Sequence, residues 1–141
     1  MRDRGLRADL TEREKIMDFI IGGAYQGKLD CAKRKFSVKD DQIYTCSEDE
    51  DISFGARCIN KIEEFTLRCV KNGADAESIF REHRGEWEDS VLICCDIFCG
   101  VVPLGAEMRA WREMTGRLCA YLSSEAETVT RMFCGLEQKL K

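Results

Sequence analysis

A glycine-rich stretch, residues 20–30 (IIGGAYQGKLD), has the composition of a loop that binds nucleotide phosphates. Gly22, Gly27 and Lys28 match the pattern G-x-x-x-x-G-K, in which glycines allow a tight turn, backbone N–H groups face the phosphates and the lysine neutralises them. The pattern continues with a Ser or Thr that holds magnesium, but this chain has Leu29. The stretch predicts a phosphate site without that hydroxyl, and a glycine turn needed for close packing is the alternative. The residues assigned to nucleotide binding are Gly22, Gly23, Ala24, Tyr25, Gln26, Gly27, Lys28 and Leu29.

A carboxylate suited to the same chemistry is Asp96, near the end of the apolar run VLICCDI, residues 91–97. A carboxylate at the end of a buried parallel strand is the usual partner of a phosphate loop, where it holds magnesium directly or through water. An aspartate that only caps a turn is the competing interpretation. We expect Lys28 and Asp96 to be the catalytic residues, with Asp96 as the Mg²⁺ ligand.

Strands and helices that could position these residues alternate along the chain. Runs rich in β-formers predict strands, and apolar residues at helical spacing predict helices. The expected strands are residues 16–21, 42–46, 91–97 and 129–134. The expected helices are residues 29–36, 59–70, 75–84 (with Asp75 as its cap) and 108–122, and the single proline, Pro103, marks a turn. This alternation predicts an α/β, P-loop-type three-layer domain with a mostly parallel sheet and a ligand site at the carboxyl ends of its strands.

The bulk composition restricts the class of protein. A chain of 141 residues suits one domain, and we assign residues 1–15 to a charged lead-in and 16–141 to a single nucleotide-binding domain. The net charge of −4 gives no basic excess, which argues against a nucleic-acid partner. No apolar run approaches the ~20 residues of a membrane span, and the N-terminus lacks the apolar core of a secretory signal. We therefore expect a cytoplasmic protein without a membrane span.

Nine cysteines are the unusual feature of the composition. Their irregular spacing favours reduced thiols that pack as small hydrophobic side chains over a disulfide framework. Cys94, Cys95 and Cys99 are clustered, but no paired C-x-x-C elements occur and His83 is the single histidine. A cysteine-based metal or redox protein is therefore the least favoured hypothesis.

Two C-terminal stretches add more specific motifs: GVVPLGAEMRAWREMTGRLCAYL (100–122) and TRMFCGLEQKLK (130–141). Together with IIGGAYQGK they resemble the adenosylcobinamide kinase/adenosylcobinamide-phosphate guanylyltransferase family of cobalamin biosynthesis. That family has a GGARSGKS-type loop, a strand ending in S-N-E-V-G, then G-I-V-P, a helix with R-x-x-R-D-x-x-G-R, and a closing G-L-P and L-K. The resemblance covers residues 16–36 and 89–141. The matching residues after the loop are Gly100, Val102, Pro103, Arg109, Arg112, Glu113, Gly116, Arg117, Gly135, Leu136, Leu140 and Lys141.

The resemblance implies a P-loop protein with two activities. Members of that family phosphorylate the side-chain hydroxyl of adenosylcobinamide with GTP or ATP and Mg²⁺. They then transfer GMP from GTP to that phosphate through a covalent guanylyl-histidine. The implied partners are a nucleoside triphosphate and a corrinoid, and because the family tends to assemble through its sheets and helices, a homo-oligomer is left open.

This chain departs from the family pattern at chemically important positions. Leu29 replaces the magnesium-binding Ser or Thr, Asp96 replaces a Glu, and Cys95 replaces an Asn or Asp. The family segment with His, then Arg-Pro, then Trp has no clear counterpart. His83, followed by an arginine and later a tryptophan, is the one available nucleophile, but its position directly before a strand fits a surface residue at a helix end better.

Two hypotheses follow from this pattern. In the first, the chain is a kinase with a reduced magnesium site and weak or absent guanylyl transfer. In the second, it is a catalytically degenerate module that binds a nucleotide or a corrinoid phosphate without turnover.

Overall fold

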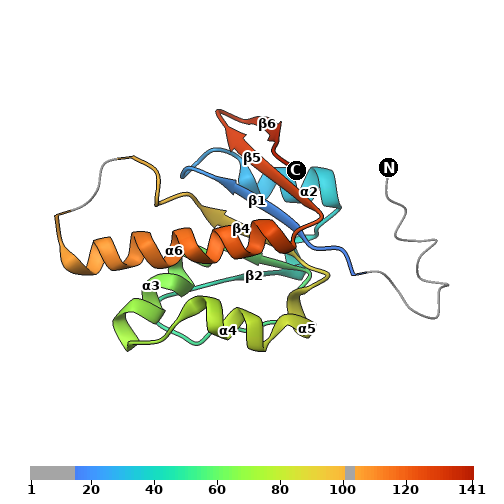
Figure 1. Ribbon diagram of the computed structural model, residues 1–141. Helices are drawn as coiled ribbons and strands as arrows, with labels where there is room; N and C mark the ends of the chain where they lie inside the picture. Colours follow the sequence, from blue (N-terminus) through green and yellow to red (C-terminus); the bar gives the residue numbers. More distant parts are fainter. Residues whose placement is uncertain (1–14, 101–103) are drawn as a thin grey trace.

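A six-stranded, mostly parallel sheet forms the centre of the molecule, in the strand order β2-β3-β4-β1-β5-β6 (Figure 1). The computed structural model describes residues 15–100 and 104–141, so most of the charged lead-in and the turn expected at Pro103 lie outside the described residues. Neighbouring strands from β2 to β5 are parallel, and β6 pairs with β5 in the antiparallel sense. The strands are β1 (Asp18–Gly22), β2 (Ile43–Thr45), β3 (Cys58–Asn60), β4 (Val91–Cys95), β5 (Thr128–Phe133) and β6 (Leu136–Lys139).

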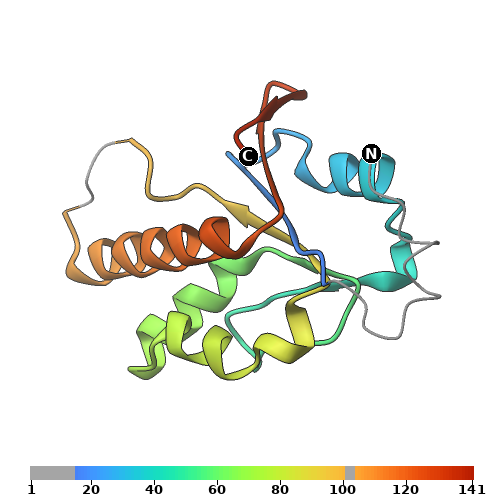
Figure 2. The ribbon, with the colours of Figure 1, turned by 45° about the vertical axis from the view of Figure 1, so that its right-hand side comes forward.

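Helices cover both faces of this sheet (Figure 2). The helices are α2 (Lys28–Phe36), a short 3₁₀ turn (Asp40–Gln42), α3 (Ile62–Asn72), α4 (Ala76–Glu82), α5 (Arg84–Trp87) and α6 (Ala106–Glu125). Alternate residues of β1 point to opposite faces, as in any strand. Phe19 and Ile21 join the core under α3, α4 and α6, whereas Ile20 joins the core under α2. The chain is therefore an α/β protein with the mostly parallel sheet that the sequence predicts.

The strand β1 lies in the interior of the sheet, with packed cores on both of its faces. It pairs with β4 on one side and β5 on the other, and all five of its residues are buried. Asp18 is the polar exception, and its carboxylate accepts a hydrogen bond from the Thr128 hydroxyl at 2.7 Å. A strand that is buried on both faces reads as a continuous apolar run, as DFIIG nearly does.

In the described residues no helix has both the length and the apolar character needed to cross a bilayer.

Most of the expected elements are confirmed, with shifts of a few residues at their ends. The helix that begins after Asp75 is one of them, because the Asp75 carboxylate accepts a hydrogen bond from the Ser78 N–H at 3.2 Å. This helix ends at Glu82 rather than Arg84, and α5 follows it directly.

Two expectations about the elements are wrong. The helix expected over 59–70 starts only at Ile62, because residues 58–60 form β3 between β2 and β4. Lys61, with a left-handed φ of 58°, separates the strand from the helix. The strand expected over 129–134 is not the last one, because β6 follows it as an edge strand whose residues are all exposed. An exposed edge strand has no buried face, so it leaves no apolar alternation to detect.

Candidate functional site

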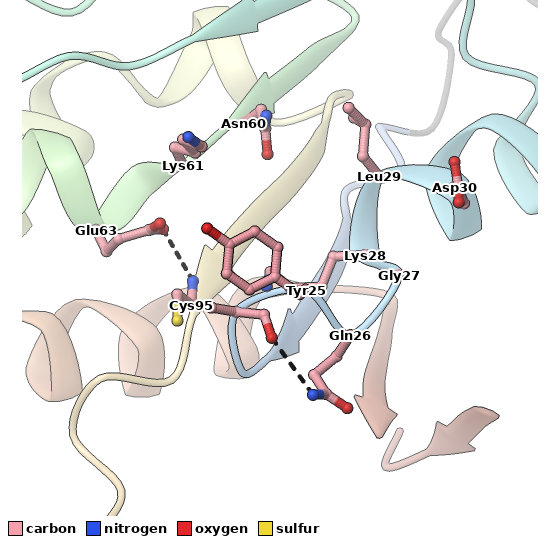
Figure 3. Close-up of a pocket in the computed structure, with 11 residues that line it drawn as sticks. Tyr25, Gln26, Gly27, Lys28, Leu29, Asp30, Asn60, Lys61, Glu63 and Cys95 are labelled. Atoms are coloured by element: carbon pink, nitrogen blue, oxygen red, sulfur yellow. Dashed lines mark hydrogen bonds between the residues drawn. The ribbon is translucent and has the colours of Figure 1, made fainter. Parts of the chain in front are cut away.

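The glycine loop, residues 23–27, connects the carboxyl end of β1 to the start of α2 (Figure 3). Gly22 precedes it as the last residue of β1 and is paired with Cys95 of β4 and Met132 of β5. A Cβ atom on Gly22 would lie 2.5 Å from the backbone oxygen of Met132. The first glycine of the motif is thus required by close packing against β5, which is the alternative that the sequence left open.

The last glycine of the motif has a conformational reason instead. Gly27 has a φ of 93° and immediately precedes α2, a backbone geometry that favours glycine. Tyr25 also has a positive φ, 59°, and its side chain is fully exposed at the tip of the loop. Gly23 has neither constraint, because a Cβ there would meet its nearest neighbour, Gln26, at 3.5 Å. A side chain at Gly23 is therefore sterically tolerable.

Backbone donors gather at this loop without partners. Within the described part of the chain, the N–H groups of residues 27–30 donate no hydrogen bond, and the first N–H of α2 to do so belongs to Cys31, which donates to the Gly27 carbonyl at 3.0 Å. The start of α2 also has no side-chain cap. Unpaired N–H groups at a helix start carry partial positive charge, so this turn is suited to an anion.

Two side chains of the loop region hold it in shape. The Lys28 ammonium donates to the Gly23 carbonyl at 2.6 Å, so it folds back across the loop. The Gln26 amide group donates to the Ala24 carbonyl at 3.3 Å and accepts a hydrogen bond from the backbone N–H of Cys134. The turn between β5 and β6 is thereby joined to the glycine loop.

A cavity of about 360 Å³, called here the loop pocket, opens between the glycine loop and the ends of β3 and β4 (Figure 3). Its charged lining residues are two cations and two carboxylates. Leu29 lines it too, and it packs against the buried residues beneath α2. Of the eight residues assigned to nucleotide binding, only Gly22 and Gly23 do not line this pocket. The lining consists of Ala24, Tyr25, Gln26, Gly27, Lys28, Leu29, Asp30, Asn60, Lys61, Glu63 and Cys95.

Asp96 lies directly beside the glycine loop. Its backbone N–H donates to the Gly22 carbonyl at 3.1 Å, and its carboxylate oxygen is 3.8 Å from the position a Cβ of Gly23 would take. This follows from the pairing of Gly22 with Cys95, because the next residue of each strand then leaves the sheet at the same place. Asp96 is not among the residues that line the loop pocket. The position of Asp96 beside the glycine loop is as expected, and metal binding by Asp96 stays a prediction.

Glu63 is a residue of this site that the sequence did not indicate. It lies in the first turn of α3, lines the loop pocket, and accepts a hydrogen bond from the Cys95 N–H through Oε1 at 2.9 Å. The pKa of Cys95 is raised by burial and then by the Glu63 carboxylate, whereas Lys28 lowers it. Charges from three segments therefore meet around the end of β4. The missed signal was β3, because Glu63 lies in the first turn of the helix that follows that strand.

His83 does not lie at this site. It connects α4 and α5, its Nδ1 is 2.6 Å from a Glu86 carboxylate oxygen, and its ring stacks on Phe54 at a centroid distance of 4.7 Å. It lines a separate cavity of about 320 Å³ beside α3 and α4. The suggested role of His83 as a nucleophile therefore has no support from its position, and its place at a helix end is the one the sequence favoured.

Six of the nine cysteines are buried, as expected for small hydrophobic side chains. Burial raises the pKa of Cys46 to about 12, and burial also raises the pKa of Cys94. Cys99 and Cys134 are exposed, and Cys95 is half-buried. Among the described residues, no group of three or more His, Cys, Asp or Glu side chains is arranged to hold a metal ion.

The arginine motif of α6 contacts the segment that follows β4. Arg112 donates from Nε to the Phe98 carbonyl at 2.8 Å and from Nη2 to the Gly100 carbonyl at 3.0 Å. Arg109 donates to the Leu104 carbonyl. These bonds tie both sides of the connection between β4 and α6 to the helix, so Arg109 and Arg112 have a structural reason in this fold.

A comparison of the chain with models of known protein families and with curated proteins finds no match to either.

Proposed function

We propose that this chain binds a nucleoside triphosphate through residues 22–29 and acts as a nucleotide-dependent kinase of the adenosylcobinamide kinase type. The observation that carries the proposal is the turn between β1 and α2, where unpartnered backbone N–H groups and Lys28 border a pocket at the carboxyl ends of parallel strands. Ligands of open α/β sheets bind at this edge. The likeness of residues 16–36 and 89–141 to that family supplies the substrate class.

In this proposal the loop amides hold the phosphates and Lys28 neutralises them. Lys28 would exchange its bond to the Gly23 carbonyl for one to a phosphate oxygen. Phosphoryl transfer depends mainly on positioning and on neutralising charge, which this arrangement supplies. The acceptor would be the side-chain hydroxyl of adenosylcobinamide.

The chain's residues also fit a magnesium ion. The Asp96 carboxylate beside Gly23 is an oxygen ligand of the kind Mg²⁺ prefers, and Mg²⁺ is commonly held by one or two carboxylates together with phosphates and water. When bound, the ion would neutralise charge on the phosphoryl group that is transferred. Guanylyl transfer is not part of the proposal, because His83 lies beside α3 and α4 and outside the loop pocket.

A second candidate function follows from Leu29. Because leucine offers no ligand to a metal, the loop could hold a nucleotide or a corrinoid phosphate without turnover. The two candidates differ in one measurement, which is product formation from adenosylcobinamide and GTP or ATP with Mg²⁺. A phosphorylated corrinoid supports the kinase, and nucleotide binding without product supports the binding module.

The binding step shared by both candidates is tested with Lys28→Ala. Removing this ammonium should weaken the affinity for GTP or ATP by about 1–3 kcal/mol, the scale of a charged hydrogen bond, which is roughly 5- to 150-fold in the dissociation constant. Isothermal titration calorimetry measures the change. Lys33→Ala is the matched control, because Lys33 lies on the same helix but forms an ion pair with Asp40 at 2.6 Å. Equal affinities for wild type and Lys28→Ala would refute the proposed site.

A further inference from the structure

Glu63 carries a free carboxylate oxygen into the loop pocket. Its Oε1 accepts the Cys95 N–H, while Oε2 makes no hydrogen bond or ion pair with any described residue. Figure 3 shows this side chain reaching from α3 toward the end of β4, across the pocket from the glycine loop. One oxygen is therefore anchored and the other is available to a ligand.

The backbone around Glu63 is held in place by α6. The Trp111 indole N–H donates to the Glu63 carbonyl at 2.8 Å and to the Thr66 hydroxyl at 3.0 Å. The Thr66 hydroxyl in turn donates to the Glu63 carbonyl at 2.9 Å and contacts the buried Thr115 hydroxyl at 2.6 Å. This network fixes the backbone of the first turn of α3, and the bond from the Cys95 N–H orients the Glu63 carboxylate.

The charges of the loop pocket give this carboxylate a role. Two cations, Lys28 and Lys61, face two carboxylates, Asp30 and Glu63, so the side chains that line the pocket sum to no net charge. A triphosphate carries several negative charges, and a lining that sums to zero leaves them uncompensated. A divalent cation between the phosphates and a carboxylate of the pocket would neutralise them. Asp30 is exposed on α2, on the side of Leu29 away from Glu63 (Figure 3), so Glu63 is the less exposed of the two lining carboxylates.

From this arrangement we propose that Glu63 is a ligand of a divalent cation that binds together with the nucleotide's phosphates. This inference rests on the proposed nucleotide site. Glu63 would supply, from the opposite wall of the pocket, the oxygen that Leu29 cannot supply from the loop. A carboxylate with one oxygen fixed and one free is suited to Mg²⁺, which takes few protein ligands and keeps several waters.

The test compares nucleotide affinity with and without Mg²⁺ by calorimetry, using GTP and ATP with wild type, Glu63→Gln and Asp30→Asn. Glutamine keeps an oxygen that can accept the Cys95 N–H, so the fold should be retained, and a thermal melt of each variant checks this. In Glu63→Gln, the factor by which Mg²⁺ raises nucleotide affinity should be smaller than in wild type by at least about tenfold, which corresponds to about 1.4 kcal/mol. Its affinity in EDTA should equal or exceed that of wild type, because a repulsive charge is gone. Asp30→Asn should keep the gain.

The outcomes separate this inference from the proposed function. A wild-type protein that binds neither nucleotide overturns the proposed function and the cation site with it. A wild-type protein that binds a nucleotide without a gain from Mg²⁺ overturns only the cation site. The same holds if Glu63→Gln retains the full gain.

Discussion

The first glycine of the loop motif offers a direct test of why the motif is there. In a phosphate loop, glycines are expected for the turn and for approach to the ligand, whereas here Gly22 is already constrained by its neighbour strand. A Cβ at Gly22 would lie 2.5 Å from the Met132 carbonyl oxygen and 3.3 Å from the Met132 Cβ. We therefore expect Gly22→Ala to destabilise the fold itself, with no ligand present.

The size of the effect follows from this geometry. Non-bonded atoms reach their optimum about 3.5–4.0 Å apart, so the pair of strands β1 and β5 must open by roughly 1 Å to admit the methyl group. The clash is with backbone, so no flexible side chain can move aside. Overpacking of this kind costs about 1–3 kcal/mol in the free energy of unfolding. With urea m-values of about 1–3 kcal/mol/M, the unfolding midpoint should fall by roughly 1 M.

Urea unfolding followed by circular dichroism measures this shift. Gly23→Ala is the matched control, because a Cβ at Gly23 would meet its nearest neighbours at 3.5 and 3.8 Å, which are ordinary contacts. Its midpoint should stay within the equivalent of about 0.5 kcal/mol of wild type. If Gly22→Ala is as stable as Gly23→Ala, the packing reason for Gly22 is wrong, and a ligand-related reason for that glycine gains weight.

Two further predictions concern stability. Thr66→Val leaves the buried Thr115 hydroxyl without its 2.6 Å partner and should lower the free energy of unfolding by about 1–3 kcal/mol. The double variant Thr66→Val, Thr115→Val should recover part of that loss. A double-mutant cycle by urea unfolding tests this, and strictly additive effects would contradict it. The hydrogen bond from Arg34 holds the pKa of Glu137 below its ordinary value of 4.5, so the bond stabilises the fold above that pH, and the contribution is lost as the pH falls through the lowered pKa. Glu137→Gln should therefore be less stable than wild type at pH 7 and converge with it in strong acid, and a stability difference that grows on acidification would contradict this sign.

The sequence determined the class of fold because its signals are local. The glycines that end the first buried strand, the cap at Asp75 and the apolar run 91–97 each specify an element within a short window of residues. Alternation of strands and helices then implies a parallel sheet, and parallel strands end at one edge. For that reason the sequence also indicated that Asp96 would come to lie beside the glycine loop.

Only the tertiary structure decided the rest, since the deciding contacts join residues far apart in the chain. β3 has three residues and exists because β2 and β4 pair with it on either side, and without it the position of Glu63 in the loop pocket could not be inferred. The reason for Gly22 depends on Met132, and the separation of His83 from the loop depends on how α4 packs against α3 and α6. Local propensity predicts where an element begins and ends, but which side chains share a pocket is fixed by long-range packing and pairing.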